Sequence, residues 1–127
     1  MNSIFIDHIV LIVSSIQRTK RFYSSFLGKP HSQDKDAIAY TIGNTKLFFA
    51  PPYKKIKNNV FNSDRIGLNH LAFGVRTHNE LKRFEQKLIK AKIKNSRIQI
   101  DKHGKKEYVW FDDPDKIRIE FYLREKS

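Results

Sequence analysis

The sequence contains no cysteine, and it has one methionine and one tryptophan in 127 residues. Without cysteine there can be no disulfide framework and no thiolate metal site, so any bound metal must use nitrogen and oxygen ligands. No apolar run reaches the roughly 18 to 20 residues of a membrane-spanning helix. The first residues also lack the basic-then-apolar pattern of a signal peptide. These absences predict a cytoplasmic protein without a membrane partner.

Acidic residues are scarce beside basic ones: 25 Lys and Arg face 13 Asp and Glu, for a formal charge of +12. A nucleic-acid-binding protein would gather such charges with aromatic residues on one face. Here the lysines are spread over several segments, and no nucleic-acid-binding motif is present, so we expect no nucleic-acid partner. The charge is instead expected to attract an anionic small-molecule substrate.

The chain contains an internal repeat. Residues 6–13 read Ile-Asp-His-Ile-Val-Leu-Ile-Val and residues 67–75 read Gly-Leu-Asn-His-Leu-Ala-Phe-Gly-Val, which places His8 and His70 62 positions apart. The same offset aligns the two Lys-Arg-Phe triplets that follow. A strand-then-helix pattern that recurs at a fixed offset indicates two copies of one module.

Each copy predicts one strand, one helix and three further strands. Period-two alternation predicts strands, and apolar residues at helical spacing predict a helix. In the first copy the strands are expected at 4–13, 31–34, 37–42 and 45–50, with a helix at 16–27. In the second copy they are expected at 67–75, 97–100, 106–111 and 116–123, with a helix after 77. The predicted fold class is therefore α+β, a single domain over 1–127 with βαβββ modules at 4–52 and 66–124 and a polar connector at 53–65.

The helix ends carry capping signals. Ser14 and Ser15 are candidate N-caps for the first helix, with Gln17 placed as in a capping box after Ser14. Thr77 and Glu80 predict a capping box for the second helix. The buried stripe of that helix is predicted to be Leu81, Phe84, Leu88 and Ile89.

The last strand of the second copy carries a carboxylate, Glu120, where the first copy has an aromatic residue. Aligning the final strands of the two copies sets Phe48 against Glu120. Alternation places Arg118, Glu120 and Tyr122 on one face and the apolar residues, which pack against the helix, on the other. An unpaired carboxylate on the concave face of the sheet would be costly, so Glu120 is expected to have a partner.

The motifs resemble those of the vicinal oxygen chelate superfamily, which includes glyoxalase I, the bleomycin and fosfomycin resistance proteins and the extradiol dioxygenases. The resemblance lies in the His8 strand, the His70 strand and Asp-Pro-Asp-x-x-x-x-Glu at 113–120. It implies paired βαβββ modules whose sheets form a cup around a divalent metal, with the helices outside. The metal ligands that it implies are His8, His70 and Glu120.

Three positions depart from relatives within that superfamily. Phe48 stands where glyoxalase I has a second glutamate, which argues against glyoxalase I activity itself. Val10 replaces the threonine of the fosfomycin-resistance proteins, and Lys116 replaces a glycine of the turn. The remaining two histidines and one carboxylate leave open coordination positions and suit Fe(II), although Mn, Zn or Ni also fits such ligands.

Two aromatic residues alternate onto the Glu120 face. Trp110 is predicted to be a substrate wall together with Phe48, and Tyr108 a substrate-binding hydrogen-bond donor or catalytic general acid. The alternative is that Tyr108 and Trp110 are packing residues, each with one polar group that takes a hydrogen-bond partner. His103 is predicted to lie in a turn and to be solvated; the alternative is that it reaches the mouth of a cavity.

The function predicted from the resemblance is a small metal-dependent enzyme, a lyase, isomerase, dioxygenase or transferase. Its metal would chelate two neighbouring oxygens of the substrate and act as a Lewis acid. The alternative is a metal-free protein that binds a small molecule or sequesters a drug, as bleomycin resistance proteins do. The resemblance further implies a homodimer.

Overall fold

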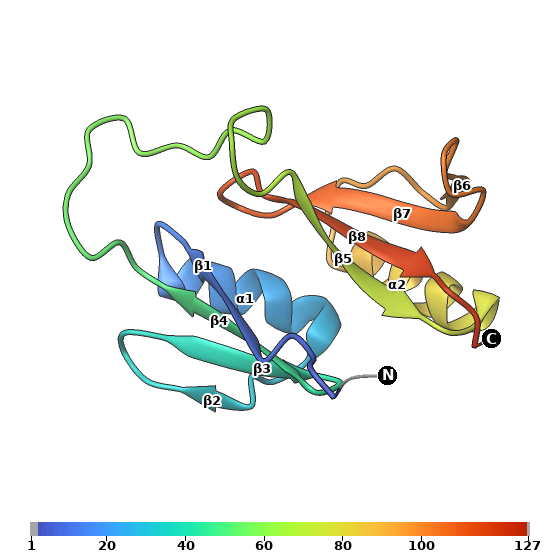
Figure 1. Cartoon of the computed structure of the whole chain (residues 1–127), viewed down its shortest axis with the longest axis horizontal. Helices are drawn as coiled ribbons and strands as arrows, with labels where there is room; N and C mark the ends of the chain where they lie inside the picture. The colour runs from blue at the N-terminus through green and yellow to red at the C-terminus, as the bar shows by residue number, and fades with distance from the viewer. Residues whose placement is uncertain (1–2, 127) are drawn as a thin grey trace. The chain divides into compact units, whose positions relative to one another are not determined.

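The computed structural model describes residues 3–126, which divide into two compact units with the boundary between Asn59 and Val60. The first unit contains β1 (His8–Ile12), α1 (Ile16–Leu27), β2 (Ser32–Gln33), β3 (Ile38–Ile42) and β4 (Thr45–Ala50). The second unit contains β5 (His70–Val75), α2 (His78–Lys90), β6 (Gln99–Ile100), β7 (Glu107–Asp112) and β8 (Arg118–Leu123). Each unit has the predicted βαβββ order (Figure 1), so the α+β fold with two modules is confirmed.

The two sheets have the same topology. Their strand orders are β1-β4-β3-β2 and β5-β8-β7-β6, with the first strand of each unit parallel to the last and the other pairs antiparallel. His8 lies opposite Lys46 in one sheet, and His70 lies opposite Arg118 in the other. Two residues further along, the same registers reach Phe48 and Glu120. The equivalence of Phe48 and Glu120 is thereby confirmed.

One helix covers one face of each sheet (Figure 1), and aromatic side chains form the contact. In the first unit, the rings of Tyr23 and Phe49 lie 4.5 Å apart and both side chains are buried. In the second unit, the rings of Phe84 and Phe121 are stacked at 4.1 Å. Neither helix of the described chain is long and apolar enough to cross a membrane.

The first strand and the cap of α1 differ from the prediction. The strand is shorter than 4–13 because its pairing with β4 begins at His8. The N-cap is Ser15, whose Oγ accepts a hydrogen bond from the backbone N–H of Arg18 at 3.1 Å. The Ser14–Gln17 capping box is wrong, because Ser14 Oγ instead accepts from the Arg18 guanidinium at 2.6 Å.

The capping box of α2 is confirmed: Thr77 Oγ1 accepts from the Glu80 N–H, and the Glu80 carboxylate accepts from the Thr77 N–H. The predicted buried stripe is partly wrong. Leu81 and Leu88 are buried, but Ile89 is exposed, and Glu85 is buried instead.

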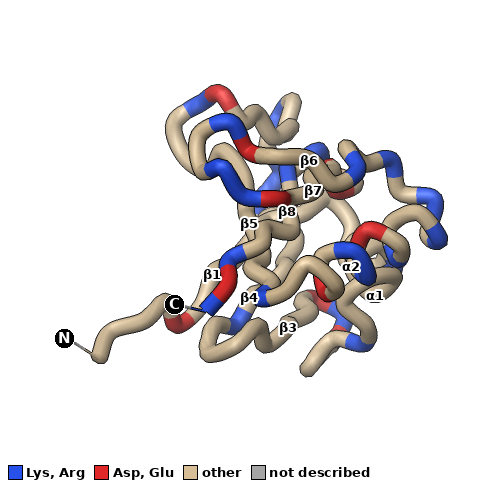
Figure 2. Tube along the Cα trace, turned by 90° about the vertical axis from the view of Figure 1, so that its right-hand side faces the viewer, with Lys and Arg blue, Asp and Glu red and all other residues tan. Residues whose placement is uncertain are grey.

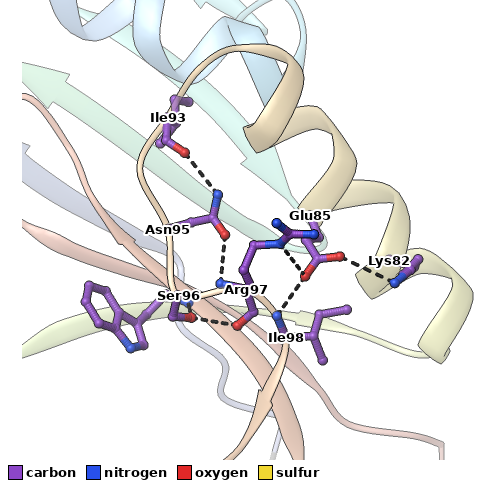
Figure 3. Close-up of polar contacts among 8 residues, drawn as sticks. Lys82, Glu85, Ile93, Asn95, Ser96, Arg97 and Ile98 are labelled. Atoms are coloured by element: carbon purple, nitrogen blue, oxygen red, sulfur yellow. Dashed lines mark hydrogen bonds and ion pairs between the residues drawn. The ribbon is translucent and has the colours of Figure 1, made fainter.

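Glu85 is buried because a later segment of chain supplies its partners (Figure 3). Its Oε2 accepts hydrogen bonds from the Ile98 N–H at 2.7 Å and from Arg97 Nε at 3.4 Å, and Lys82 Nζ lies 3.6 Å from Oε1. Burial alone would raise the pKa of Glu85. The hydrogen bond from Ile98 and the charges of Lys82 and Arg97 outweigh that effect, so its pKa lies below the usual value.

The turn between β7 and β8 fixes the start of the strand that carries Glu120. The buried Asp113 accepts hydrogen bonds from the N–H groups of Asp115 and Ile117 at 2.8 and 2.9 Å. Lys116 has a positive φ of 66°, a conformation that glycine adopts more readily. This turn therefore explains both the Asp-Pro-Asp motif and the position at which the resemblance predicted a glycine.

Candidate metal and substrate site

His70 and Glu120 meet on the open face of the second sheet. His70 begins β5, and Glu120 lies in the middle of β8, the strand beside it. His70 Nε2 lies 3.6 Å from Glu120 Oε1. The Glu120 side chain is only 13% exposed, whereas that of His70 is 42% exposed, so the pair forms the inner end of a site that is open to solvent.

The preceding residue orients each of the two repeat-related histidines. Asn69 Nδ2 donates to the Ser63 carbonyl at 3.0 Å, so Asn69 Oδ1 faces His70 and accepts from its Nδ1 at 2.7 Å. In the first unit, Asp7 Oδ2 holds His8 Nδ1 at 2.8 Å. An acceptor on Nδ1 fixes the tautomer that leaves Nε2 free to bind a metal. The sequence analysis did not identify this role of Asp7 and Asn69.

The chemistry of His70 and Glu120 fits a divalent metal. Ligand atoms about 2.1 Å from one metal ion lie roughly 3 to 3.5 Å from each other, close to the separation observed here. Within residues 3–126, no three His, Cys, Asp or Glu side chains form a metal-binding group. His8, the third predicted ligand, belongs to the first unit, so the three-ligand set stays a prediction.

The electrostatics of Glu120 also fit a group that needs a cation. Burial raises the pKa of Glu120, His70 opposes that rise, and the charge of Asp101 adds to it. A divalent ion beside this carboxylate would favour the ionised form far more strongly than a histidine does.

A pocket with a volume of about 580 Å³ opens beside this pair in the second unit. Its polar lining includes His70, Asp101, His103, Tyr108, Glu120 and Tyr122. Ala72 lies opposite Glu120 in the sheet, and Gly74 lies opposite Tyr122. These two small residues on β5 leave the space above the sheet empty. His103 lines the pocket, which agrees with the alternative to the predicted solvated position.

Two tyrosines face this pocket in different hydrogen-bonding states. Tyr108 has no hydrogen-bond partner for its hydroxyl among the described residues, while the Tyr122 hydroxyl donates to Asp101 Oδ2 at 2.8 Å. That hydrogen bond raises the pKa of Tyr122 and lowers the pKa of Asp101. Burial raises the pKa of Tyr108, and the charge of Glu120 adds to the effect. The alternation of β8 indicated the direction of Tyr122, but no pattern in the sequence pointed to Asp101.

Trp110 is not among the residues that line this pocket, and Phe48 belongs to the other unit. Trp110 is directly opposite Glu120 in the sheet, yet the Arg118 guanidinium lies over its ring at 3.8 Å. Phe48, in the first unit, is half-buried and meets the His8 ring edge-on at 5.9 Å. Their predicted roles as substrate walls stay predictions.

The comparisons with known proteins agree with this architecture. The family model described as the Glyoxalase/Bleomycin resistance protein/Dioxygenase superfamily matches residues 5–121. The chain belongs to this superfamily. The match takes in both β5 and β8, the strands that carry His70 and Glu120.

The individual proteins that the chain resembles share less than 30% of its sequence. The chain is 28% identical over 123 residues to the uncharacterized protein YqjT of Bacillus subtilis (strain 168), covering 89% of this chain and 94% of that protein. A putative glyoxalase from Bacillus halodurans has a similar fold, with a TM-score of 0.79, 22% identity and coverage of 94% and 95% of the two chains. So does the fosfomycin resistance protein FosX from Listeria monocytogenes, with a TM-score of 0.68, 16% identity and coverage of 98% and 95%. At these identities the two solved structures show the fold alone.

Proposed function

We propose that this protein is a small metal-dependent enzyme of the superfamily, with a divalent ion held by His8, His70 and Glu120. The observation that carries the proposal is the convergence of His70 Nε2 and Glu120 Oε1 at 3.6 Å, with His70 Nδ1 already bound to Asn69. A divalent ion between these two atoms would bind the Nε2 lone pair and the Glu120 carboxylate together. Phe48 in place of a fourth ligand leaves coordination positions for two neighbouring substrate oxygens.

The bound ion would supply Lewis-acid stabilisation of negative charge on a substrate oxygen. The chain's own residues would bind and orient the substrate. The pocket beside Glu120 admits the organic part of the molecule, and the unpartnered Tyr108 hydroxyl can donate a hydrogen bond or a proton to it. The reaction class we propose is therefore isomerisation, lysis, group transfer or dioxygen-dependent cleavage of a compound with adjacent oxygens.

Metal content after purification without chelators tests this proposal. We expect close to one equivalent of Fe, Mn, Zn or Ni in the wild type. Because each proposed ligand supplies a bond, we expect large losses in His8→Ala and His70→Ala and none left in a combined His70→Ala, Glu120→Ala variant. His31→Ala is the matched control, since His31 is exposed and lies outside the proposed ligand set.

A wild type that stays empty after each metal is added would contradict the enzyme proposal. The pocket in the second unit would then support the alternative, a metal-free protein that binds small molecules. If His8→Ala alone kept the full metal content, the ligand set would need to be reassigned around His70 and Glu120. The homodimer implied by the resemblance stays a prediction, which sedimentation equilibrium can check.

A further inference from the structure

The end of the pocket formed by the turn after β6 holds a polar pair, Tyr122 and Asp101. The Tyr122 hydroxyl donates to Asp101 Oδ2 at 2.8 Å, and Asp101 Oδ1 accepts from the His103 N–H at 3.0 Å. A phenol has one proton to donate, and an ionised carboxylate can only accept. With that proton directed at Asp101, the Tyr122 oxygen offers the pocket its remaining lone pairs. The pair is therefore a hydrogen-bond acceptor.

The local fold builds this pair into the pocket. The turn is closed by backbone hydrogen bonds from the Asp101 N–H to the Lys106 carbonyl and from the Lys105 N–H to the Asp101 carbonyl, both 2.8 Å. A Cβ atom at Gly104 would collide with the Tyr122 hydroxyl. Only glycine at this position lets the turn close over that hydroxyl.

Tyr108 complements this acceptor. Its ring centre lies 5.9 Å from that of Tyr122, and its hydroxyl has no hydrogen-bond partner in the described part of the chain. The wall of the pocket thus presents the Tyr108 hydroxyl as a donor and the Tyr122 oxygen as an acceptor, and Arg124, whose guanidinium carbon lies 5.5 Å from the centre of the Tyr122 ring, also lines it. Opposite Tyr122 in the sheet is Gly74, where nothing lies within 4 Å of the position of a Cβ atom. Because Asp101, Tyr108 and Tyr122 all line the pocket, a ligand group inside it can reach the pair.

We propose that the Tyr122–Asp101 pair is a specificity-determining site that accepts a hydrogen bond from a hydroxyl group of the substrate. The substrate then needs more than two neighbouring oxygens that chelate the metal. It also carries a further hydroxyl group that donates to this pair. This inference rests on the proposed metal-dependent function, because the chelated oxygens would anchor the substrate beside Glu120. A site that accepts a hydrogen bond discriminates strongly against an analogue without the donor.

Two hydroxypyranones form a matched pair of probes. Kojic acid and allomaltol chelate metals through the same two neighbouring oxygens, and kojic acid has a hydroxymethyl group where allomaltol has a methyl group. Isothermal titration calorimetry of both with zinc-loaded protein gives the ratio of their dissociation constants. We expect kojic acid to bind the wild type about tenfold more tightly, the usual effect of one hydrogen bond to a charged or polarised acceptor.

The variants locate the source of that ratio. Tyr122→Phe removes the phenolic acceptor but releases Asp101 Oδ2, so the double variant Tyr122→Phe, Asp101→Ala is the one that removes both acceptors and should bring the ratio to about one. Tyr53→Phe is the control, because Tyr53 is 89% exposed in the connector and should keep the tenfold ratio. Circular dichroism and the zinc content of each variant verify that it is folded and loaded.

Each other outcome overturns the inference in a recognisable way. Equal affinities for the two probes in the zinc-loaded wild type, or a ratio that survives in the Tyr122→Phe, Asp101→Ala variant, would contradict the role of the pair and leave the metal site intact. A wild type that takes up no zinc would contradict the proposed function itself, and the inference would fail with it because nothing would anchor either probe.

Discussion

At the scale of single residues, the most informative side chains stand directly before the two histidines. Asn69 is fixed at both ends: its amide nitrogen donates to the Ser63 carbonyl and its oxygen holds His70. A partner of this kind determines which ring nitrogen of a histidine can bind a metal. The Asn69–His70 contact therefore matters to the site as much as the position of His70 itself.

We expect Asn69→Leu to weaken metal binding about 10- to 100-fold, the usual effect of losing the partner that orients a ligand histidine. Asn69→Asp keeps an oxygen acceptor and should keep most of the affinity. Competition with a chromophoric zinc chelator measures both constants. Asn62→Ala is the control, because its side chain caps only the Asp64 N–H in the connector. Unchanged affinity in Asn69→Leu would show that His70 needs no orienting partner.

Gly74 determines how much space the pocket has. It lies in an extended strand with a negative φ, so other residues can adopt its backbone conformation, and a Cβ there would enter open space. We expect Gly74→Val to block the pocket and lower the affinity for allomaltol more than about tenfold, with metal content unchanged and stability unchanged or raised. Gly74→Ala should have an intermediate effect, as measured by the same calorimetry. Full allomaltol binding in Gly74→Val would place the ligand elsewhere.

At the scale of helices and strands, the sequence predicted most of what depends on local pattern. The bounds of α1 and β4 agree with the predictions at 16–27 and 45–50, because apolar spacing and turn residues define them. The first strand was predicted too long. Its apolar residues extend beyond the five residues that pair with β4, and only the pairing decides where a strand begins.

In the candidate site, too, local pattern predicted some features and not others. Alternation along β8 predicted the direction of Glu120 and Tyr122, and the resemblance implied that His70 and Glu120 are ligands of one metal. The partners Asn69 and Asp101 depend on where a connector and a turn return to the sheet, which no local pattern encodes. Glu85 is a further case: a charged residue on a helix face is predicted to be exposed, but residues 97 and 98 fold back to pair with it.

The Glu85 contacts make a prediction about the second unit. Because the folded-state pKa of Glu85 lies below its usual value of 4.5, its carboxylate contributes stability that is complete at neutral pH and is lost as pH falls below about 4.5 through the folded-state pKa. Glu85→Gln cannot titrate, so it should cost about 1 to 3 kcal/mol at pH 7 and less as the pH falls. Glu80→Gln is the comparison, since the amide oxygen can keep the capping box.

Urea unfolding followed by tryptophan fluorescence is the appropriate measurement for Glu85→Gln. The sequence has a single tryptophan, Trp110, and it lies in β7, so the signal reports on the second unit. Its backbone also pairs with Ser96, next to the segment that Glu85 holds. A difference between wild type and Glu85→Gln that stays constant from pH 7 to pH 3 would show that the charge of Glu85 adds no stability.

At the scale of the whole molecule, the net charge of +12 is the dominant property. Figure 2 shows Lys and Arg at many places along the traces of both units, with Asp and Glu among them. A charge spread in this way acts through the summed field of the protein. Such a field attracts anions of any shape and increases their association rate, and salt screens it.

We therefore expect the association rate of oxalate, an anionic chelator of two oxygens, with the zinc-loaded protein to fall several-fold between about 0.02 and 0.3 M KCl. The rate for uncharged allomaltol should change little. Stopped-flow mixing measures both. Replacing Lys54, Lys55 and Lys57 with glutamine should reduce the oxalate effect modestly, and so should replacing Arg83, Lys90 and Lys94, because each triple removes the same charge from an exposed segment. If one triple abolished the salt dependence and the other had no effect, a local cluster near the site, and not the charge of the whole molecule, would be attracting the anion.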